Sequence, residues 1–435
     1  MAVRALLSAG SNAQGQLATG DTEDAHAFVS CSFLGAGSAA LPENTSRVRQ
    51  VACGANHTIV LLERVQGPSG ALTHELWGCG DGKKGQLGVA YDGSDTTVFR
   101  PLDLNLPGLR LEGYVIRTVV ASWETTYVVL SRPEHRDVVL SMGADDFGDL
   151  GINGKGKAVH STVHVVNFDN VIPTNHEEKK YTLVISHISA GPHHVVAHLC
   201  ATYADGTELL RVVGWGTSRH GQLGAYKDAA SGKPVPYLAS PHLISLPIDP
   251  GESITSSALG THHTVLVRGS GGLLSLGSSR KSQLDGIEAL QNISMVGCTW
   301  NGTYAVSQQG DAWSIFSAGN HNKGQLGRPL HVKHNNPHGH HPLAVQFPFS
   351  SKTHDFVKMV CGSEHVLCLF RRKDMIVTSS PATEVWGWGW NEHGNLGLGS
   401  TEDKDAPVKI WPPSQEEHRT VLDIWAGYGT TWVLV

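Results

Sequence analysis

Two short motifs alternate along the whole chain, and each of them occurs seven times. The first is an apolar strand that runs into G-x-x-x-x-G-Q-L, and its copies are SAGSNAQGQL, GCGDGKKGQL, SMGADDFGDL, GWGTSRHGQL, SLGSSRKSQL, SAGNHNKGQL and GWGWNEHGNL. The second is an apolar strand, a short turn and another apolar strand, and its copies are VACGANHTIVLL, VVASWETTYVVL, ISAGPHHVVAHL, SALGTHHTVLV, VGCTWNGTYAV, MVCGSEHVLCL and IWAGYGTTWVLV. Recurrence of this kind indicates an architecture in which each repeat is one supersecondary unit.

The spacing and composition of the repeats predict the fold. The residue after the four-residue gap of the first motif marks each repeat, and consecutive markers lie 42 to 73 residues apart. WD-type repeats of ~40 residues and kelch repeats of ~50 residues have other motifs. Short strands rich in Val, Ile, Leu and Thr, interrupted by glycine, predict one small antiparallel sheet per repeat, and sheets arranged radially bury their faces against one another. We therefore predict an all-β fold, a seven-bladed β-propeller that forms a single domain over residues 1–435. The markers are Gly15, Gly85, Gly148, Gly221, Ser282, Gly324 and Gly394.

The two ends of the chain are predicted to close this ring. The chain begins on a first-motif strand, from Arg4 to Ser8, and ends on the last strand of a second motif, from Thr431 to Val435. Elsewhere these two strands follow one another across a short turn, which predicts that they pair as a hairpin. Pairing of the N-terminal strand with the C-terminal strand then leaves no blade open, which protects the ring from edge-to-edge aggregation.

Composition and charge weigh against several classes of function. The net charge is −6 and no stretch is rich in Lys and Arg, so we expect no direct DNA binding. No apolar run approaches the ~20 residues that cross a bilayer, and the opening MAVRALLSAGS is too short for a secretory signal, so we expect no membrane association. Seven cysteines without a CxxC pair favour neither a disulfide framework nor a zinc ribbon, and they fit a reducing compartment.

Several repeated residues are expected to have structural roles. The turn glycines stand where positive φ or a close approach of backbone favours a residue without Cβ. Histidines that follow them at one repeat position are expected to form the same side-chain-to-backbone hydrogen bond in each blade. The G-x-x-x-x-G spacing lacks the Lys-Ser/Thr and the helix of a phosphate-binding loop, so no nucleotide site is predicted. The glycines are Gly54, Gly191, Gly260, Gly362 and Gly427, and the histidines are His57, His194, His263 and His365.

No pattern predicts a catalytic centre, a cofactor site or a resident metal. The chain lacks GxSxG, HExxH and CxxC. The acidic residues Asp145, Asp146 and Asp149 resemble a calcium loop only loosely, because the length and the closing Glu are missing, so a solvated loop is expected. The run HVKHNNPHGHH is expected to be a solvated inserted loop, with adventitious metal binding as the alternative. Its histidines are His331, His334, His338, His340 and His341.

Aromatic residues in the two motifs predict a partner-binding face. The residue after the turn glycine position is aromatic in three repeats, and one first motif carries tryptophan where the other six carry Ser, Asp, Ala, Thr, Ser or Asn. The strand directions place all four aromatic residues on one face of the disc. Trp and Tyr dominate binding hot spots, although each ring could instead fill the gap between blades near the central channel. The candidate partner-binding residues are Trp123, Trp300, Trp390 and Tyr428, with Glu392 and His393 beside Trp390.

The doubled motif resembles the repeats of the regulator-of-chromosome-condensation family over essentially the whole chain. Within that family, the segments VACGANHTIVLL, GCGDGKKGQL, SWETTYVVL, GWGWNEHGNLG and GYGTTWVLV resemble the fungal alpha-tubulin suppressor (killer-toxin-insensitivity) group. This resemblance implies a non-enzymatic cytoplasmic and nuclear protein that forms a heterodimer with the small CSL-type zinc-finger protein of diphthamide synthesis. Through that partner it implies support for Elongator-dependent modification of the tRNA wobble uridine and for diphthamide formation. The zinc and the redox iron would belong to the partner.

Two other members of the family suggest different functions. An exchange factor for a Ran-type small GTPase has this fold but usually carries a basic N-terminal extension, whereas the first repeat here begins at residue 4. A plant ultraviolet-B photoreceptor places Arg beside Trp in the same turn, whereas Trp123 precedes Glu124 and Trp300 precedes Asn301 here. An interface cannot be carried over through the expected long loops at 64–74, 153–180, 226–242 and 328–348, which match nothing in the repeat.

Overall fold

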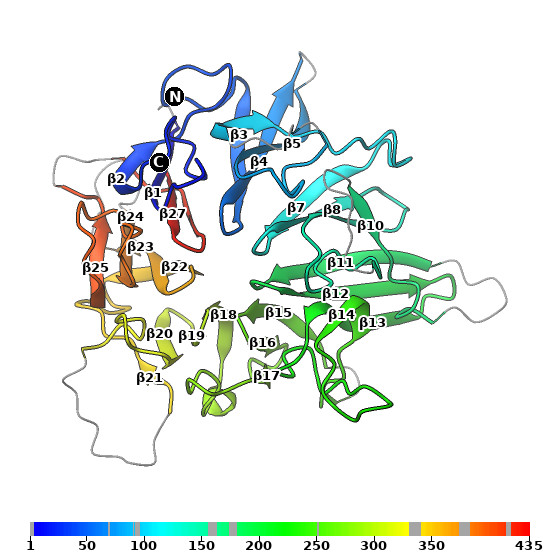
Figure 1. Ribbon diagram of the computed structural model, residues 1–435. Helices are drawn as coiled ribbons and strands as arrows, with labels where there is room; N and C mark the ends of the chain where they lie inside the picture. Colours follow the sequence, from blue (N-terminus) through cyan, green and yellow to red (C-terminus); the bar gives the residue numbers. More distant parts are fainter. Residues whose placement is uncertain are drawn as a thin grey trace.

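Seven small sheets surround a central axis in the computed structural model of the protein (Figure 1). The sheets are antiparallel; within the described part of the chain, six have four strands and one has three. The all-β, seven-bladed propeller predicted from the doubled motif is therefore confirmed. The structure describes residues 4–67, 70–89, 91, 96–154, 163–173, 181–249, 252–329, 341–373, 383–414 and 419–435.

The blades follow one another in chain order, and the first strand of each blade lies nearest the axis. Blades 1 to 3 contain β3 (Thr45–Cys53), β4 (His57–Gln66), β5 (Ala71–Gly80), β6 (Thr96–Pro101); β7 (Val115–Ala121), β8 (Thr125–Ser131), β9 (Val138–Gly143), β10 (His164–Val166); and β11 (Tyr181–Ala190), β12 (His194–Tyr203), β13 (Glu208–Thr217), β14 (Tyr237–Leu243). Blades 4 to 6 contain β15 (Ile254–Leu259), β16 (His263–Arg268), β17 (Leu273–Gly277); β18 (Ile293–Thr299), β19 (Gly302–Gln309), β20 (Ala312–Gly319), β21 (Leu343–Ala344); and β22 (His354–Cys361), β23 (His365–Arg372), β24 (Thr383–Gly389), β25 (Lys404–Trp411). Blade 7 combines β26 (Asp423–Ala426), β27 (Thr430–Leu434), β1 (Leu6–Gly10) and β2 (Ala25–Ser30).

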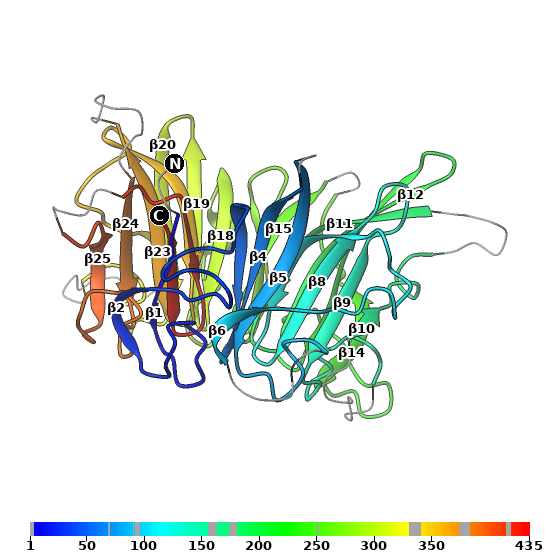
Figure 2. The same cartoon turned by 90° about the horizontal axis from the view of Figure 1, so that it is seen from above.

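Blade 7 closes the ring by pairing the two ends of the chain, as predicted. Strand β1 runs antiparallel to β27, with Leu6 opposite Leu434 and Gly10 opposite Thr430. The pairing continues one residue further, because Ala5 and Val435 exchange backbone hydrogen bonds of 2.9 and 3.0 Å. The N and C labels accordingly lie side by side in Figures 1 and 2. One blade thus depends on residues more than four hundred positions apart.

Blade 4 differs from the others because its repeat is the shortest. Only 42 residues separate the markers Ser282 and Gly324, and the described residues of this blade form three strands followed by the 3-10 helix η1 (Ile287–Ala289). Ser282 stands where the other repeats have glycine and adopts a φ of 60°. A segment this short connects blades 4 and 5 directly, without room for a fourth strand.

The core lies between neighbouring blades, where the inward side chains of one sheet pack on the next. Trp215 and Trp388 are completely buried in two of these interfaces. The indole nitrogen of Trp215 donates to the carbonyl of Asp149 in the preceding blade at 2.9 Å, and that of Trp388 donates to the carbonyl of Gln325 at 2.8 Å. Each buried tryptophan therefore has a partner for its polar group while it fills the space between two blades.

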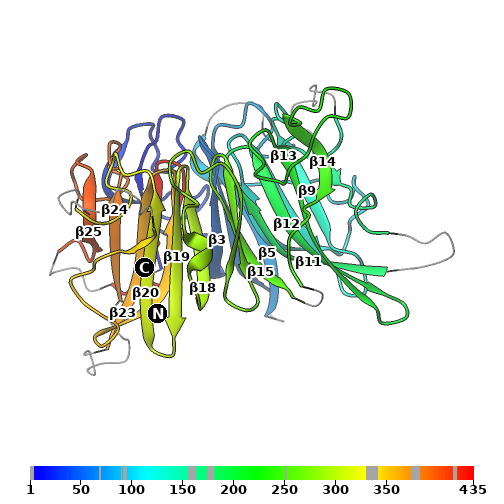
Figure 3. The same cartoon turned by 90° about the horizontal axis from the view of Figure 1, so that it is seen from below.

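The four segments expected to be long loops each contain some regular structure. Strands β4 and β5 continue to Gln66 and start again at Ala71, so 64–74 is mostly a hairpin. Strands β10, β14 and β21 lie in the other three segments and add an outer strand to their blades. The expectation was wrong there because outer strands carry neither repeat motif. In the side views, blade 3 extends beyond the rest of the disc (Figures 2 and 3).

No helix in the described part of the chain is long and apolar enough to span a membrane.

Candidate functional site

The turns of the second motif and the loops of the first lie on one face of the disc, as the strand directions predicted. In each blade, the residue after the glycine that ends the first-motif strand donates its backbone N–H to the carbonyl of the second turn residue. We name this surface the turn face. Its backbone has the same shape in every blade, so side chains distinguish one blade from another. The bonds, 2.7 to 3.0 Å long, join Ser11 to Gly429, Asp81 to Asn56, Ala144 to Glu124, Thr217 to His193, Ser278 to His262, Asn320 to Asn301 and Trp390 to Glu364.

The glutamine of the first motif holds its own loop in shape. Gln86 is buried, and its side-chain oxygen accepts the backbone N–H of Lys84 at 2.8 Å. A buried amide is stable only when its polar atoms are paired, and this bond also satisfies a loop N–H. The same bond recurs with Gln16, Asp149, Gln222, Gln283 and Gln325 at 2.8 to 3.0 Å.

Two of the three aspartates expected in a solvated loop are buried instead. Asp149 stands at the glutamine position and accepts the N–H of Phe147, and it is only 3% exposed. Asp145 is 8% exposed and accepts the N–H of Leu150 at 2.9 Å. Burial, followed by the charges of Asp149 and Asp146, raises the pKa of Asp145. Only Asp146 is exposed as expected.

The turn glycines are required by close packing. None of the five has a positive φ. A Cβ added to Gly362 would lie 2.1 Å from the ring of His365 and 2.5 Å from the carbonyl oxygen of Gly427 in the next blade. Gly54 and Gly260 are crowded by His57 and His263 in the same way. Of the two explanations that the sequence left open, close approach is therefore the one that holds.

The repeated histidines bind side chains of the next blade, which corrects the expected side-chain-to-backbone bond. The Nε2 atom of His57 lies 3.0 Å from the hydroxyl of Thr126, which itself donates to the carbonyl of Gln86 at 2.9 Å. That threonine can only accept from the imidazole, so His57 carries its proton on Nε2. The sequence did not show this partner because the threonine belongs to the following repeat. Equivalent pairs join His194 to Thr264, His263 to Thr303 and His365 to Thr431 at 3.0 to 3.3 Å.

Burial keeps these histidines neutral. It lowers the pKa of His57 and of His194 to about 3, and the pKa of His263 and of His365 to about 4. An uncharged imidazole at each position avoids four buried charges within one ring. Their place at the blade interfaces confirms that they are framework residues.

Backbone hydrogen bonds also link the turns of successive blades. The N–H of Ala55 donates to the carbonyl of Trp123 at 2.8 Å, and the N–H of Trp123 donates to the carbonyl of Pro192 at 3.0 Å. On the other side of the ring, the N–H of Thr261 donates to the carbonyl of Trp300 at 3.0 Å, and the N–H of Trp300 donates to the carbonyl of Ser363 at 2.7 Å. Pro192 has no N–H, so it cannot continue the chain of bonds to blade 4. Both tryptophans are thus held by their own backbone on each side.

Three of the candidate aromatic residues meet at the axis. The ring centroid of Trp123 lies 6.0 Å from that of Trp300 and 5.2 Å from that of Tyr428. The ring centroids of Trp300 and Tyr428 are 6.3 Å apart. All three side chains are half-buried. These contacts are in the range of favourable aromatic pairs. We name Trp123, Trp300 and Tyr428 the aromatic cluster.

The fourth aromatic candidate lies beside the cluster. A Cβ on Gly429 would be 3.7 Å from the ring of Trp390, and the indole nitrogen of Trp390 donates to Glu392 at 3.0 Å. The ring of His393 is 5.2 Å from that of Trp390, and its Nδ1 atom lies 2.6 Å from a carboxylate oxygen of Asp24. The six predicted site residues therefore form two adjacent groups on the turn face, one at the axis and one on blade 6.

Two further residues extend the cluster and were missed by the sequence reasoning. The ring of His193 lies 6.1 Å from Trp123 and 4.7 Å from Phe147, which is 41% exposed. His193 also approaches the carboxylate of Asp149 at 3.4 Å. Phe147 is the single aromatic residue at its position in the seven first motifs. The comparison of repeats that pointed to Trp390 would have identified it as well.

Charge is unevenly distributed over the turn face. The exposed cations Arg219 and Arg280 occupy equivalent positions in the loops of blades 3 and 4. Beside them the rings of His220 and His262 lie 4.1 Å apart, and burial followed by the Arg280 charge lowers the pKa of His220. Asp146 occupies the equivalent position in blade 2 and Glu392 in blade 6. A partner on this face would therefore meet cations on blades 1, 3 and 4, where Lys83 holds the equivalent position in blade 1, and single carboxylates on blades 2 and 6.

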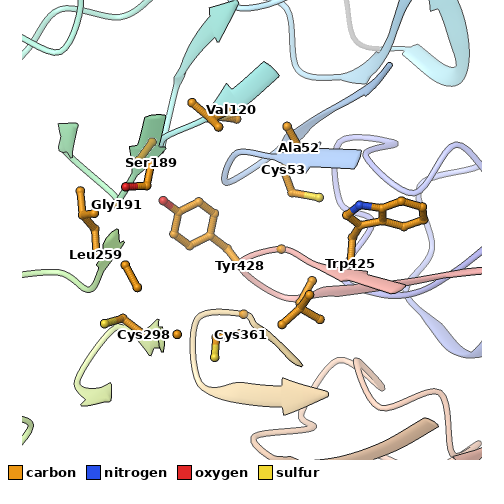
Figure 4. A pocket seen from close by; sticks show the side chains of 18 of the residues that line it. Ala52, Cys53, Val120, Ser189, Gly191, Leu259, Cys298, Cys361, Trp425 and Tyr428 are labelled. Atoms are coloured by element: carbon orange, nitrogen blue, oxygen red, sulfur yellow. The ribbon is translucent and has the colours of Figure 1, made fainter. Parts of the chain in front are cut away.

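Below the cluster, the central channel contains a cavity of about 400 Å³. The inner strands of all seven blades line it, and Tyr428 lies across it in Figure 4, with Cys53, Cys298 and Cys361 around it. Burial raises the pKa of Cys53 to about 11 and that of Cys298 to about 12, so both are protonated thiols at neutral pH. Protonated thiols are poor nucleophiles and poor metal ligands.

The described residues contain no cluster of three His, Cys, Asp or Glu side chains that could hold a metal ion. In the histidine-rich run only His341 belongs to the described residues, and it is exposed. His331, His334, His338 and His340 lie outside them, so the expected solvated loop stays a prediction.

Comparison with known proteins supports the repeat type and the fold. The model of the regulator of chromosome condensation (RCC1) repeat matches residues 5–61, 314–369 and 384–434. The ultraviolet-B receptor UVR8 of Arabidopsis thaliana is 26% identical over 98% of this chain and 82% of the receptor. The secretion-regulating guanine nucleotide exchange factor of Mus musculus is 25% identical over 95% of this chain and 80% of that protein. An RCC1 repeat-containing protein of Schizosaccharomyces pombe is 23% identical over 99% of this chain and 98% of that protein.

Solved structures agree on the architecture. Human WBSCR16 superposes with a TM-score of 0.69 at 19% identity and covers 100% of this chain and 99% of its own. Prp20p of Saccharomyces cerevisiae has a TM-score of 0.69 at 17% identity, and the match covers 99% of this chain and 91% of that one. The narrower resemblance to the fungal alpha-tubulin suppressor group stays a proposal. The chain therefore has the fold of an RCC1-like propeller, and three segments of it match the RCC1 repeat.

Proposed function

We propose that the protein is a non-enzymatic docking platform that binds a partner protein through its turn face. The observation that carries this proposal is the meeting of Trp123, Trp300 and Tyr428 at the axis, with Trp390 beside them on the same rigid surface. Half-buried aromatic rings on a fixed backbone lose little entropy when a partner covers them. The neighbouring cations and carboxylates would set the orientation of the partner.

The groups available for acid–base or nucleophilic chemistry support a role without catalysis. The four repeated histidines are neutral and engaged with threonines, and the channel thiols Cys53 and Cys298 are protonated. A catalytic base needs a pKa near the working pH and access to a substrate. The repeat uses these side chains to join blades instead.

We infer a specific partner from the motif resemblance: the small CSL-type zinc-finger protein of diphthamide synthesis. The heterodimer would act in the cytoplasm and nucleus, supporting diphthamide formation and, through Elongator, modification of the tRNA wobble uridine. The segments GWGWNEHGNLG and GYGTTWVLV, which carry that resemblance most distinctively, supply Trp390, Glu392, His393 and Tyr428 to the turn face. The zinc would be brought by the partner.

Isothermal titration calorimetry with the purified zinc-loaded partner tests both parts of the proposal. We expect a variant with Trp123→Ala, Trp300→Ala and Trp390→Ala to bind at least about 100-fold more weakly, because truncated hot-spot residues cost about 2 kcal/mol or more each. Leu72→Ala, at an exposed position of β5 on the hairpin opposite the turn face, is the matched control and should bind normally.

Folding is checked separately by the melting temperature of each variant. Trp390→Ala alone removes a ring outside the aromatic cluster and should weaken binding without lowering that temperature greatly. Equal affinity of a folded triple variant would show that the choice of face is wrong. Absence of binding by the wild-type protein would show that the choice of partner is wrong.

A second candidate function is nucleotide exchange on a Ran-type small GTPase. It is favoured by the 25% identity to the mouse secretion-regulating guanine nucleotide exchange factor over 95% of this chain. Release of a fluorescent guanine nucleotide from the purified GTPase, followed with and without this protein, distinguishes the two. Acceleration of release would favour the exchange factor over the platform.

A further inference from the structure

Blades 3 and 4 leave a second cavity between them, away from the turn face. Its volume is about 520 Å³, and it lies between β12, β13, the segment after β14 and the start of β15. Strand β12 begins at the turn face with His194 and runs away from it, so His198 and Cys200 lie four and six residues down the strand. Pockets that bind small molecules have volumes of about 300–1,000 Å³.

The walls of this cavity are mainly apolar. On one side of blade 3, His198 is opposite Val212 and Cys200 is opposite Leu210 in neighbouring strands. Blade 4 and its linker contribute Leu246, Ile248 and Ile254, which pack against the core between the two blades.

The rim of the cavity is apolar as well and is open to solvent. Leu210 is 52% exposed and Leu243 is 40% exposed, and both line the cavity. Exposed apolar side chains gathered around an opening mark binding sites more often than isolated ones do.

His198 is the one buried polar side chain of this lining without a hydrogen-bond partner among the described residues. It is 4% exposed, and neither ring nitrogen is bonded. Its ring lies 5.0 Å from that of His187, and the backbone of Ile254 approaches it. Burial lowers the pKa of His198 to about 3, so the imidazole is neutral and offers one donor and one acceptor.

The charged residues of the lining are accounted for. Glu252 forms an ion pair with Arg268 at 3.0 Å and accepts a hydrogen bond from Ser270. Arg211 alternates with Val212 along β13, so its side chain leaves the opposite side of the sheet. Among its described lining residues, the cavity therefore has mainly apolar walls, one unsatisfied neutral imidazole and no unmatched charge directed into it.

We propose that this cavity binds a small uncharged molecule with an apolar body and one hydroxyl or carbonyl group that hydrogen-bonds to His198. Such a ligand buries the apolar rim and satisfies the imidazole, whereas a carboxylate would be desolvated without a cation to pair with. The site is separate from the turn face and does not rest on the proposed partner.

Titration with 2-naphthol, which has an aromatic body and one hydroxyl, tests the proposal. We expect one molecule to bind per chain and 2-naphthoate to bind at least tenfold more weakly. His198→Phe should weaken 2-naphthol about five- to tenfold, the effect of one hydrogen bond, and leave naphthalene binding unchanged. Leu246→Trp fills the cavity and should abolish binding of both. Leu422→Ala, at an exposed apolar position of blade 7, is the control and should change neither.

Alkylation of Cys200 by iodoacetamide, measured by mass spectrometry, supplies a readout that is independent of affinity. Bound 2-naphthol should slow it severalfold in the wild type and not in Leu246→Trp. Binding that Leu246→Trp leaves intact overturns the proposal. So does absence of binding with unchanged Cys200 reactivity, which would mean that water fills the cavity. If a partner protein protects Cys200 and 2-naphthol does not, the cavity receives a side chain of that protein, and the small-molecule proposal is overturned.

Discussion

The turn face and the opposite end of the same blades differ in how their polar groups are satisfied. At the turn face each blade repeats one backbone bond, such as Ser11 to Gly429, and the motif glutamine caps its own loop. At the opposite end the hairpins differ from blade to blade, and His198 is buried without a partner among the described residues. A repeated sequence thus builds a rigid surface at one end and leaves room for individual features at the other.

The difference shows which residues are free to vary. On the turn face the histidine, threonine and glycine positions are used in joining blades, and the glutamine position holds its own loop. Specificity there resides in the residues between them, such as Trp123 and Trp390. Among the described residues of the opposite end no common bond restrains the hairpins, and a cavity between two blades can persist. Four experiments test how far the turn face depends on its repeated contacts.

Deletion of residues 1–10 should have the largest effect. It removes β1 and leaves β27 unpaired on one side, which opens the ring and exposes the core of blade 7. We expect the melting temperature to fall by more than about 10 °C, or the protein to aggregate. A circular permutant that joins Val435 to residue 1 and opens at the exposed Asp205–Gly206 turn retains the β1–β27 pair and should melt near the wild type. An unchanged melting temperature after the deletion would contradict ring closure as the source of stability.

Acidification should be the next largest effect. The folded-state pKa values of His57, His194, His263 and His365, about 3 to 4, lie below the ordinary 6.5, so the unfolded chain takes up protons first as the pH falls. The contribution of these histidines to the free energy of unfolding is complete above about pH 6.5 and is lost toward pH 4. The loss is up to about 1.4 kcal/mol per histidine and pH unit. Urea unfolding at about pH 7.5 and about pH 5.5 measures the loss. His57→Gln should make the free energy of unfolding less dependent on pH, by about the share of one histidine. Equal urea midpoints at the two pH values would argue against neutral framework histidines.

Gly362→Ala should destabilise the turn face by about 3 kcal/mol, because the new Cβ would collide with the ring of His365 and the carbonyl of Gly427. Gly37→Ala is the matched control, since its nearest contact would be Ala40 at 3.9 Å and its φ is not positive. The two free energies of unfolding, from urea titrations, should differ by most of that amount. Similar values would mean that the turn has room to relax.

Thr126→Val should have the smallest effect of the four, about 1–3 kcal/mol, because it leaves His57 without its acceptor between blades 1 and 2. Thr73→Val is the control: its hydroxyl is buried without a partner among the described residues, so its replacement should be neutral or stabilising. Chemical unfolding of both variants gives the comparison. A loss at Thr73 as large as that at Thr126 would refute the role assigned to the histidine–threonine pair.

The fold was predictable because it repeats. Seven copies of two motifs carry the number of blades, and the position of Arg4 and Val435 within those motifs implies the closing pair. The shared face of Trp123, Trp300, Trp390 and Tyr428 followed from strand direction alone. The burial of Asp145 and Asp149 did not, because an acidic residue in a loop is usually solvated. The alignment of SMGADDFGDL with the other copies places Asp149 at the glutamine position, but only the folded loop shows that both carboxylates accept backbone N–H groups.

By itself the sequence determined the architecture, since a periodic pattern of strands and turns has one economical way to bury its apolar faces. Only the tertiary structure decided which side chains meet across blades, namely the threonine beside each repeated histidine and the three rings at the axis. It also decided that His198 is buried between blades 3 and 4 beside a cavity. Those contacts join residues of different repeats, at distances and angles that depend on how neighbouring sheets pack, and no spacing within one repeat encodes them.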